Sequence, residues 1–168
     1  MKKVILVIVV AVIFLIVALS AYKKTSGSSL FSLSSPTPRP MYSLRIGDTN
    51  VKVVLAKTPK EITQGLSGAD PLAPNEGMLF IFDKPTQPAF WMKDMRFDLD
   101  MIWIREGKVV DIHENVPSPD PRASLSSLPL YISKEPADSV LEVSAGFAKT
   151  HKIVNGTEVD TAFETIVP

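Results

Sequence analysis

The amino-acid sequence predicts an all-β domain, a small sandwich or barrel of short, mostly antiparallel strands with one or two short helices. An N-terminal transmembrane helix and a disordered linker are predicted to precede it. From residue 42 onward, short segments alternate apolar and polar residues with the period of two that half-buried strands show. Turns containing glycine or proline separate these segments at short intervals. Before residue 42, an uncharged apolar run is followed by a stretch rich in serine and proline.

Residues 1–22 have the character of a membrane anchor or signal segment. The run from Val4 to Ala21 nearly reaches the roughly 20 apolar residues that span a bilayer. It is longer than the roughly 7–15 residues usual for the core of a signal peptide, so an uncleaved anchor is predicted. The small residues Ala18 and Ser20 leave cleavage open as the alternative, and a cleaved chain would be secreted.

The charges that flank this run predict its orientation. Lys2, Lys3 and the amino terminus precede it and outnumber Lys23 and Lys24, which favours a cytoplasmic start. The chain is therefore expected at the cell membrane with a single pass and an extracytoplasmic domain, residues 42–168. Residues 23–41 would form a flexible linker between the two, with a reach of roughly 20–25 Å.

Composition excludes several classes of function. The 168 residues include no cysteine, which rules out disulfides, thiolate metal sites and a cysteine nucleophile. The formal net charge is zero, but residues 42–168 carry 13 Lys and Arg against 18 Asp and Glu. Binding to nucleic acid needs a basic surface, so nucleic acid is not a predicted partner. No cofactor is predicted.

The domain is predicted to begin with a hairpin and a short helix. Apolar and polar residues alternate over 42–46 and again over 51–55, with a turn at residues 47–50. Thr58 then offers a helix N-cap, Pro59 a first helical residue and Glu61 the partner for a capping box. Gly65 is placed to end this helix after about Gln64.

The rest of the domain is predicted to consist of strands and one long loop. The wholly apolar segment Met78–Phe82 suits a strand that is buried on both faces. A glycine at position 107 marks a tight hairpin between two later strands. Further strands are predicted at Ala89–Met92, Leu99–Ile104, Val109–Asn115, Val140–Ser144 and Val159–Phe163, with a helical turn at Gly146–His151. Residues 117–130 carry four prolines and four serines and are expected to form an irregular loop.

Four segments resemble an uncharacterised family, domain of unknown function 192. They are EGMLFIFD (Glu76–Asp83), FWMK (Phe90–Lys93), LDMIWI (Leu99–Ile104) and VLEVSAGFAKTHKIVNG (Val140–Gly156). The resemblance extends from about Leu44 to Val159. It implies a small all-β domain that is often exported or anchored in a membrane, and it implies no established activity.

The sequence departs from the pattern of this family at three positions. Members commonly show FWMKNT and a proline before LD, where this chain has Asp94, Met95 and Asp98. Some members also carry a cysteine pair in a loop that corresponds to residues 117–129, where this chain has none. The resemblance therefore implies no role for these three residues.

Asp98 and Asp100 are weak candidates for catalysis. Two residues apart on a predicted strand, they project from one face and Leu99 from the other. Such a pair could act as acid and base if the surroundings of the two groups differ. The simpler interpretation is that both acids are solvated or bonded to backbone amides. Ile102 and Ile104 share the face of Asp100, so this side of the strand is expected to be partly covered, and a covered acid needs a polar partner. Lys93 is the expected partner.

Metal binding has weaker support. His113 and His151 are the only histidines, and neither has the spacing of a zinc site. Met92, Met95 and His113 are ligand types that suit monovalent copper outside the cytoplasm. The simpler interpretation is that these methionines only fill the hydrophobic core.

The favoured function is binding of a small molecule, a glycan or a peptide by a membrane-tethered extracytoplasmic domain. The expected cleft lies around the FWMK and LD segments and includes Glu76, Trp91, Met92, Lys93 and Asp100. A non-catalytic role is favoured over an enzyme. The alternatives are a hydrolase or lyase that acts on a saccharide through Asp98 and Asp100, and an assembly module in an envelope complex.

Overall fold

The computed structural model describes residues 39–166. The predicted membrane anchor and most of the predicted linker lie outside the described residues. Within residues 39–166, no helix is long and apolar enough to span a membrane.

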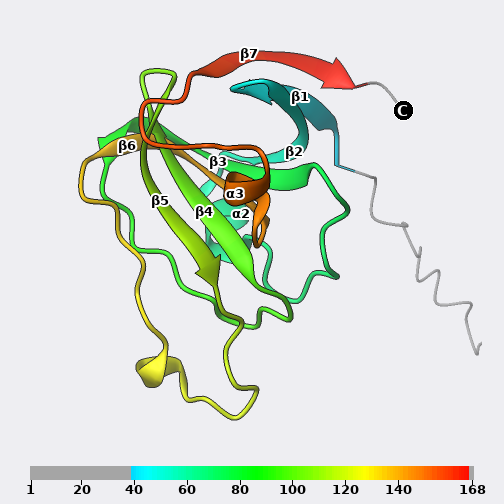
Figure 1. The fold of residues 1–168 in the computed structure, drawn as a ribbon. Coiled ribbons are helices and arrows are strands. Elements are labelled where there is room, and N and C mark those ends of the chain that lie inside the picture. The colour runs from blue at the N-terminus through cyan, green and yellow to red at the C-terminus, as the bar shows by residue number, and fades with distance from the viewer. Residues whose placement is uncertain (1–38, 167–168) are drawn as a thin grey trace, which may run out of the picture. The chain divides into compact units, whose positions relative to one another are not determined.

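Seven strands form one sheet that curls into a half-barrel (Figure 1). Their order in the sheet is β5-β4-β6-β3-β2-β1-β7, and all neighbours are antiparallel except the parallel pair β2 and β3. The strands are β1 (Met41–Ile46), β2 (Thr49–Ala56), β3 (Glu76–Thr86), β4 (Leu99–Arg105), β5 (Lys108–Val116), β6 (Ala137–Ser144) and β7 (Val159–Ile166). The all-β prediction is confirmed, with a single curled sheet as its form.

The segment that leads into β7 joins the two ends of the curled sheet at one corner. Val109 in β5 donates its N–H to the Thr157 carbonyl over 2.9 Å, and its own carbonyl accepts from Gly156 over 2.7 Å. The turn between β1 and β2 is tied to the same segment, because the Gly47 N–H bonds to the Glu158 carbonyl. These bonds hold the sheet in its curled form.

The predicted hairpins and the predicted helix are confirmed. β1 pairs with β2, and β4 pairs with β5 through a turn in which Glu106 and Gly107 have positive φ. The helix α2 (Pro59–Gln64) carries the expected capping box with Thr58, and Gly65 follows it. The remaining helices are α3 (Phe147–Thr150) and the 3-10 turn η1 (Leu125–Ser127), which lies in the long loop.

The strand predicted at Ala89–Met92 is wrong. Only Phe90 makes a bridge there, to Tyr131, and the residues around it run as an irregular segment. Phe90 and Met92 are buried while Trp91 is exposed. The alternation in this segment therefore comes from side chains that insert into a core from a loop, and not from strand pairing.

Two hydrophobic cores lie on the two faces of the sheet. The inner core fills the curl, receives residues from all seven strands, and includes Phe147 and Ala148 of α3. The outer core lies on the opposite face, over the middle strands β3, β4 and β6. Its cover comes from Leu66 after α2 and from Phe90, Met92 and Met95 of the segment between β3 and β4.

Candidate functional site

An open cleft of about 800 Å³ lies outside the outer core, between α2 and the turn formed by residues 91–94. α2 contributes Lys60, Thr63 and Gln64 to its lining, and the turn contributes Trp91, Lys93 and Asp94. We call this space the Trp91 cleft. Two of the residues expected at a binding site, Trp91 and Lys93, line it.

Hydrogen bonds hold the two walls of the Trp91 cleft together. The Ser67 hydroxyl donates to the Lys93 carbonyl over 2.8 Å, and the Gly68 N–H donates to the Asp94 carbonyl over 3.0 Å. Gln64 is fixed as well, because its side-chain amide donates to the Ser67 carbonyl over 3.0 Å. The cleft is thus formed before any ligand arrives, which lowers the entropy lost on binding.

The turn at residues 91–95 decides which side chains face the cleft. Asp94 has φ +57°, a left-handed conformation that Asp and Asn adopt more readily than most residues. The Met95 N–H bonds to the Met92 carbonyl over 3.2 Å and closes the turn. As a result Met92 and Met95 point into the outer core, whereas Trp91 points away from it.

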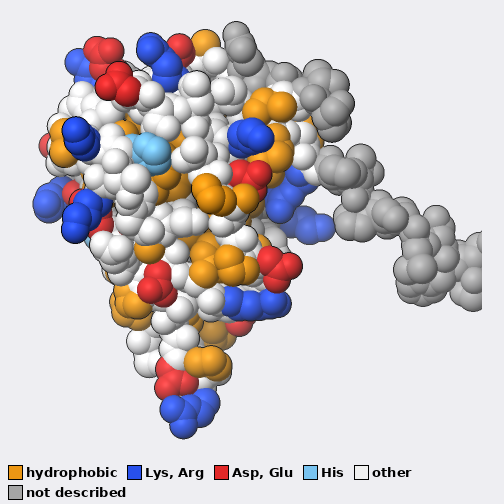
Figure 2. Space-filling model, turned by 45° about the vertical axis from the view of Figure 1, so that its right-hand side comes forward, with side chains coloured by type: hydrophobic (Ala, Val, Ile, Leu, Met, Phe, Trp, Pro, Cys, Tyr) orange, Lys and Arg blue, Asp and Glu red, His pale blue; other side chains and the backbone are white. Residues whose placement is uncertain are grey.

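Trp91 is 42% exposed, although burial of a large aromatic side chain is strongly favourable. Close to it, the Lys93 ammonium and the Asp94 carboxylate form an ion pair of 2.6 Å. An aromatic face beside charged and amide groups can stack on a ligand and bond to its polar edges. Figure 2 shows one face of the domain, on which hydrophobic side chains are interspersed with charges of both signs.

A much smaller space, of about 30 Å³, adjoins the Trp91 cleft, and we call it the Glu142 chamber. Thr63, Gln64, Ser67 and Trp91 line both spaces. The rest of its lining is apolar except for Glu142, and includes Leu66, Phe80, Phe90 and Met95. The chamber therefore connects the cleft with the outer core.

Glu142 is the functional candidate that sequence reasoning missed. It lies on β6 directly between Met78 of β3 and Met101 of β4, and only 4% of it is exposed. Within residues 39–166, no hydrogen bond or ion pair reaches its carboxyl group. Burial raises the pKa of Glu142 to about 8, so the group is a neutral carboxylic acid at pH 7. The signal in the sequence was an acid inside the apolar run VLEV.

Asp100 does not belong to the Trp91 cleft. It is fully buried on the face of the inner core, where its carboxylate accepts three backbone N–H groups: Asn115 at 2.8 Å, Gly146 at 3.1 Å and Ala148 at 2.8 Å. The expectation that Lys93 is its partner is wrong, because Lys93 pairs with Asp94. Asp100 fastens β4 to the start of α3 and to the end of β5.

The remaining predicted residues of the cleft also lie elsewhere. Glu76 begins β3 opposite Lys52 of β2 and does not line the cleft. Met92 is buried beneath the turn. Asp98, the other catalytic candidate, is exposed and accepts hydrogen bonds from the Ser118 N–H at 2.8 Å and the Ser118 hydroxyl at 2.9 Å. The prediction of one cleft that contains both Trp91 and Asp100 is therefore wrong.

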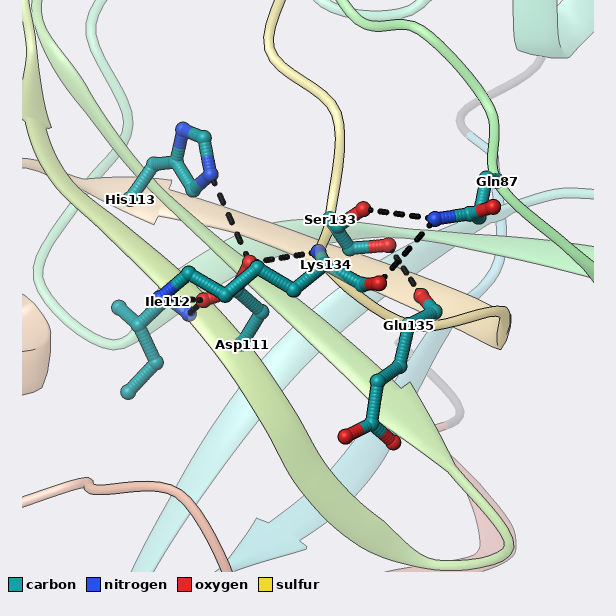
Figure 3. A network of polar contacts seen from close by, with 7 residues as sticks. All are labelled: Gln87, Asp111, Ile112, His113, Ser133, Lys134 and Glu135. Carbon is teal, nitrogen blue, oxygen red and sulfur yellow. Dashed lines mark hydrogen bonds and ion pairs between the residues drawn. The ribbon is translucent and has the colours of Figure 1, made fainter.

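A second polar cluster surrounds Asp111 (Figure 3). This buried carboxylate accepts the Lys134 N–H over 3.0 Å, and His113 Nε2 lies 3.7 Å from it. Gln87 donates to the carbonyls of Ser133 and Lys134, so the same segment is held from the opposite side. The cluster fastens the segment before β6 to β5, which is a structural role.

The residues suggested for copper all border the outer core, because His113 packs against Trp103, a member of that core, and against Tyr131. Met92 and Met95 belong to this core, and the His113 ring lies 4.7 Å from the Trp103 ring and 5.8 Å from the Tyr131 ring, centroid to centroid. Among the described residues, no group of three or more His, Asp or Glu side chains is placed to hold a metal ion. Copper binding by thioethers stays a prediction.

Comparison with known proteins gives a family and a fold. The sequence model of DUF192, described as "Uncharacterized ACR", matches residues 42–161. No curated protein matches the chain. A crystal structure of a proposed transcription regulator from Sinorhizobium meliloti is 29% identical with a TM-score of 0.66, and covers 75% of this chain and 97% of that one. A protein of unknown function from Novosphingobium aromaticivorans is 24% identical with a TM-score of 0.65, and covers 75% of this chain and 89% of that one.

Proposed function

The chain belongs to the DUF192 family, and on that premise we propose that it is a membrane-tethered extracytoplasmic domain that binds a saccharide in the Trp91 cleft. The family and the fold name no reaction, so the argument rests on the site. The single observation that carries it is the exposed indole of Trp91 in a preformed cleft between polar side chains.

A saccharide is the ligand class that fits this lining best. The C–H face of a pyranose ring can stack on the indole of Trp91, while its hydroxyls bond to side chains at the ring edge. Gln64, Lys60, Lys93 and Asp94 supply both donors and acceptors around the indole. A peptide or another small polar molecule would use the same groups.

The alternative function, a hydrolase or lyase that acts on a saccharide, required Asp98 and Asp100 in one site. Asp100 is held by three backbone N–H groups on the other face of the sheet, and Asp98 is bonded to Ser118. Neither carboxylate lines the Trp91 cleft. We therefore propose binding without catalysis, and we propose no role with nucleic acid, because residues 42–168 carry more acidic than basic groups.

Titration of the full chain with soluble trisaccharides tests the proposal. The protein is kept in a polyoxyethylene detergent, because alkyl maltosides carry the chemistry under test. We expect chitotriose, cellotriose or maltotriose to shift the indole N–H signal of Trp91 and to bind with a submillimolar Kd by calorimetry. Failure of all three to move that signal would contradict the proposal.

Two variants make this test specific. Trp91→Ala should weaken binding at least tenfold, because it removes the stacking surface. Leu125→Ala is the matched control, since Leu125 is also an exposed apolar residue but lies in the long loop and does not line the cleft. It should bind as the unchanged protein does.

Cell fractionation tests the proposed tether separately. We expect the full chain to stay with membranes after alkaline carbonate extraction, and protease added to intact cells or spheroplasts to digest the domain. Recovery of the chain in the soluble fraction would contradict an uncleaved anchor.

A further inference from the structure

We propose that the Trp91 cleft selects saccharides that carry an N-acetylamino group, and that the Glu142 chamber receives this group. The inference rests on the proposed function, because it needs a saccharide stacked on Trp91. It adds the chemical class of that saccharide and a residue that recognises it.

The position of the chamber supports the inference. Trp91, Thr63, Gln64 and Ser67 line both the cleft and the chamber, so the two spaces meet at the indole. A substituent of a ring stacked on Trp91 can therefore point into the chamber. The ring itself stays in the cleft, because about 30 Å³ admits only a few atoms, one water molecule needing roughly 10–15 Å³.

The lining of the chamber offers both apolar and polar contacts to an acetamido group. Its apolar side chains, among them Leu66, Phe80 and Phe90, suit the methyl group. The neutral carboxylic acid of Glu142 can donate its O–H to the amide carbonyl oxygen and accept the amide N–H on its other oxygen. Glu142 lines the chamber and has no bonded partner among the described residues, so its carboxyl oxygens are available for this pairing.

Other substituents fit less well. A hydroxyl group would leave most of the apolar lining without contact. A free amine would enter as a cation, and it would have to pass the ammonium groups of Lys60 and Lys93 in the cleft. It would also require an ion pair with the buried Glu142, and desolvation of two charges costs more than that of a neutral pair.

Calorimetry on the full chain at pH 6.5 with three trisaccharides tests the inference. Chitotriose carries acetamido groups, cellotriose has hydroxyls at the same positions, and the fully deacetylated chitotriose has amines. We expect chitotriose to bind at least tenfold more tightly than either of the others.

Two variants of Glu142 assign the preference to this side chain. Glu142→Gln keeps a donor and an acceptor and should keep the preference for chitotriose. Glu142→Leu has similar volume and no polar group, so its affinity for chitotriose should fall to that for cellotriose while its affinity for cellotriose stays unchanged. If Glu142 had only a structural role, Glu142→Leu would weaken the binding of chitotriose and of cellotriose alike.

The outcomes separate this inference from the proposed function. Equal affinities for chitotriose and cellotriose in the unchanged protein would overturn the acetamido inference and leave saccharide binding intact. Tighter binding of the deacetylated ligand would overturn it in favour of a cation in the chamber. Absence of binding by all three ligands and by maltotriose would overturn both proposals. The ligand comparison decides the matter even if Glu142→Leu fails to fold.

Discussion

Glu142 and Asp100 are both buried acids, yet their surroundings give them opposite properties. Asp100 accepts three backbone N–H groups, which satisfy its carboxylate and fix it in place. Glu142 has thioethers of Met78 and Met101 on the neighbouring strands and no bonded partner among the described residues. One acid stabilises the fold, whereas the other destabilises it and is available to a ligand.

The free energy of unfolding should depend on pH through Glu142. Its pKa is about 8 in the folded protein and 4.5 in the unfolded chain, so between these values only the folded protein keeps the proton. Folding then takes up a proton, and stability falls as the pH rises from about 4.5 to 8, by up to about 5 kcal/mol. Below and above this window, Glu142 adds no further pH dependence.

Urea unfolding of residues 39–168 at several pH values measures this effect. Glu142→Gln should lack the decline, and its advantage over the unchanged protein should grow steadily from pH 5 to pH 8. Other titrating groups are common to both proteins and cancel in the difference. Parallel pH profiles for the two proteins would contradict the buried, unpartnered state of Glu142.

Asp100 should prove essential for stability and unnecessary for saccharide recognition. Asp100→Ala leaves one buried and two partly buried N–H groups without this acceptor, which should cost at least about 3 kcal/mol. Asp98→Ala is the control on the same strand end, and its cost should stay within about 1 kcal/mol because Asp98 is exposed. Thermal unfolding gives the two costs, and a saccharide titration below the melting temperature should give unchanged affinity for both variants.

At the scale of elements, the turn between β3 and β4 has the strongest influence on the site. Its left-handed residue, Asp94, allows Trp91 to face solvent while Met92 and Met95 fill the outer core. The FWMKNT pattern that this segment resembles would place asparagine at position 94. Asparagine, like aspartate, adopts positive φ at low cost.

Substitutions at Asp94 should separate backbone conformation from charge. Asp94→Asn should change the free energy of unfolding by no more than about 1 kcal/mol, because it removes only an exposed ion pair with Lys93. Asp94→Val should cost about 1–3 kcal/mol and weaken saccharide binding, because a β-branched residue resists this conformation. Chemical denaturation and calorimetry measure both effects. A similar loss in Asn and Val variants would show that the charge matters and not the turn.

The elements with local signals could be predicted from the sequence. The capping box of α2 and the glycine of the β4–β5 turn each lie within a few residues of the structure they specify. The segment around Trp91 could not be predicted, because alternating burial has the same pattern in a strand and in a loop that inserts Phe90 and Met92 into a core. The parallel pairing of β2 with β3 and the place of Asp100 depend on tertiary contacts.

At the scale of the whole domain, one sheet separates a structural face from a binding face. The curl encloses the inner core and α3, and Asp100 ties these parts together. The outer core carries the Glu142 chamber, and the Trp91 cleft lies outside it. Adjacent residues of β4 therefore face opposite sides of the sheet, one toward the inner core and the next toward the outer core.

Met101 and Ile102 provide the sharpest test of this division. They are neighbours on β4 and both are fully buried, but Met101 belongs to the outer core beside Glu142 and Ile102 to the inner core. Replacement of either by Ala removes a large buried side chain and should cost about 2–5 kcal/mol. The stability loss alone therefore does not distinguish them.

Saccharide binding should distinguish the two variants where stability does not. In Met101→Ala the floor around Glu142 loses a packed side chain, so the chitotriose Kd should rise severalfold and the Trp91 indole N–H signal should shift. In Ile102→Ala the cavity forms on the other face, and both observables should stay as in the unchanged protein at a temperature where each variant is folded. If Ile102→Ala weakened binding as much as Met101→Ala, the sheet would transmit packing changes from one face to the other, and the two cores would form one cooperative unit around the site.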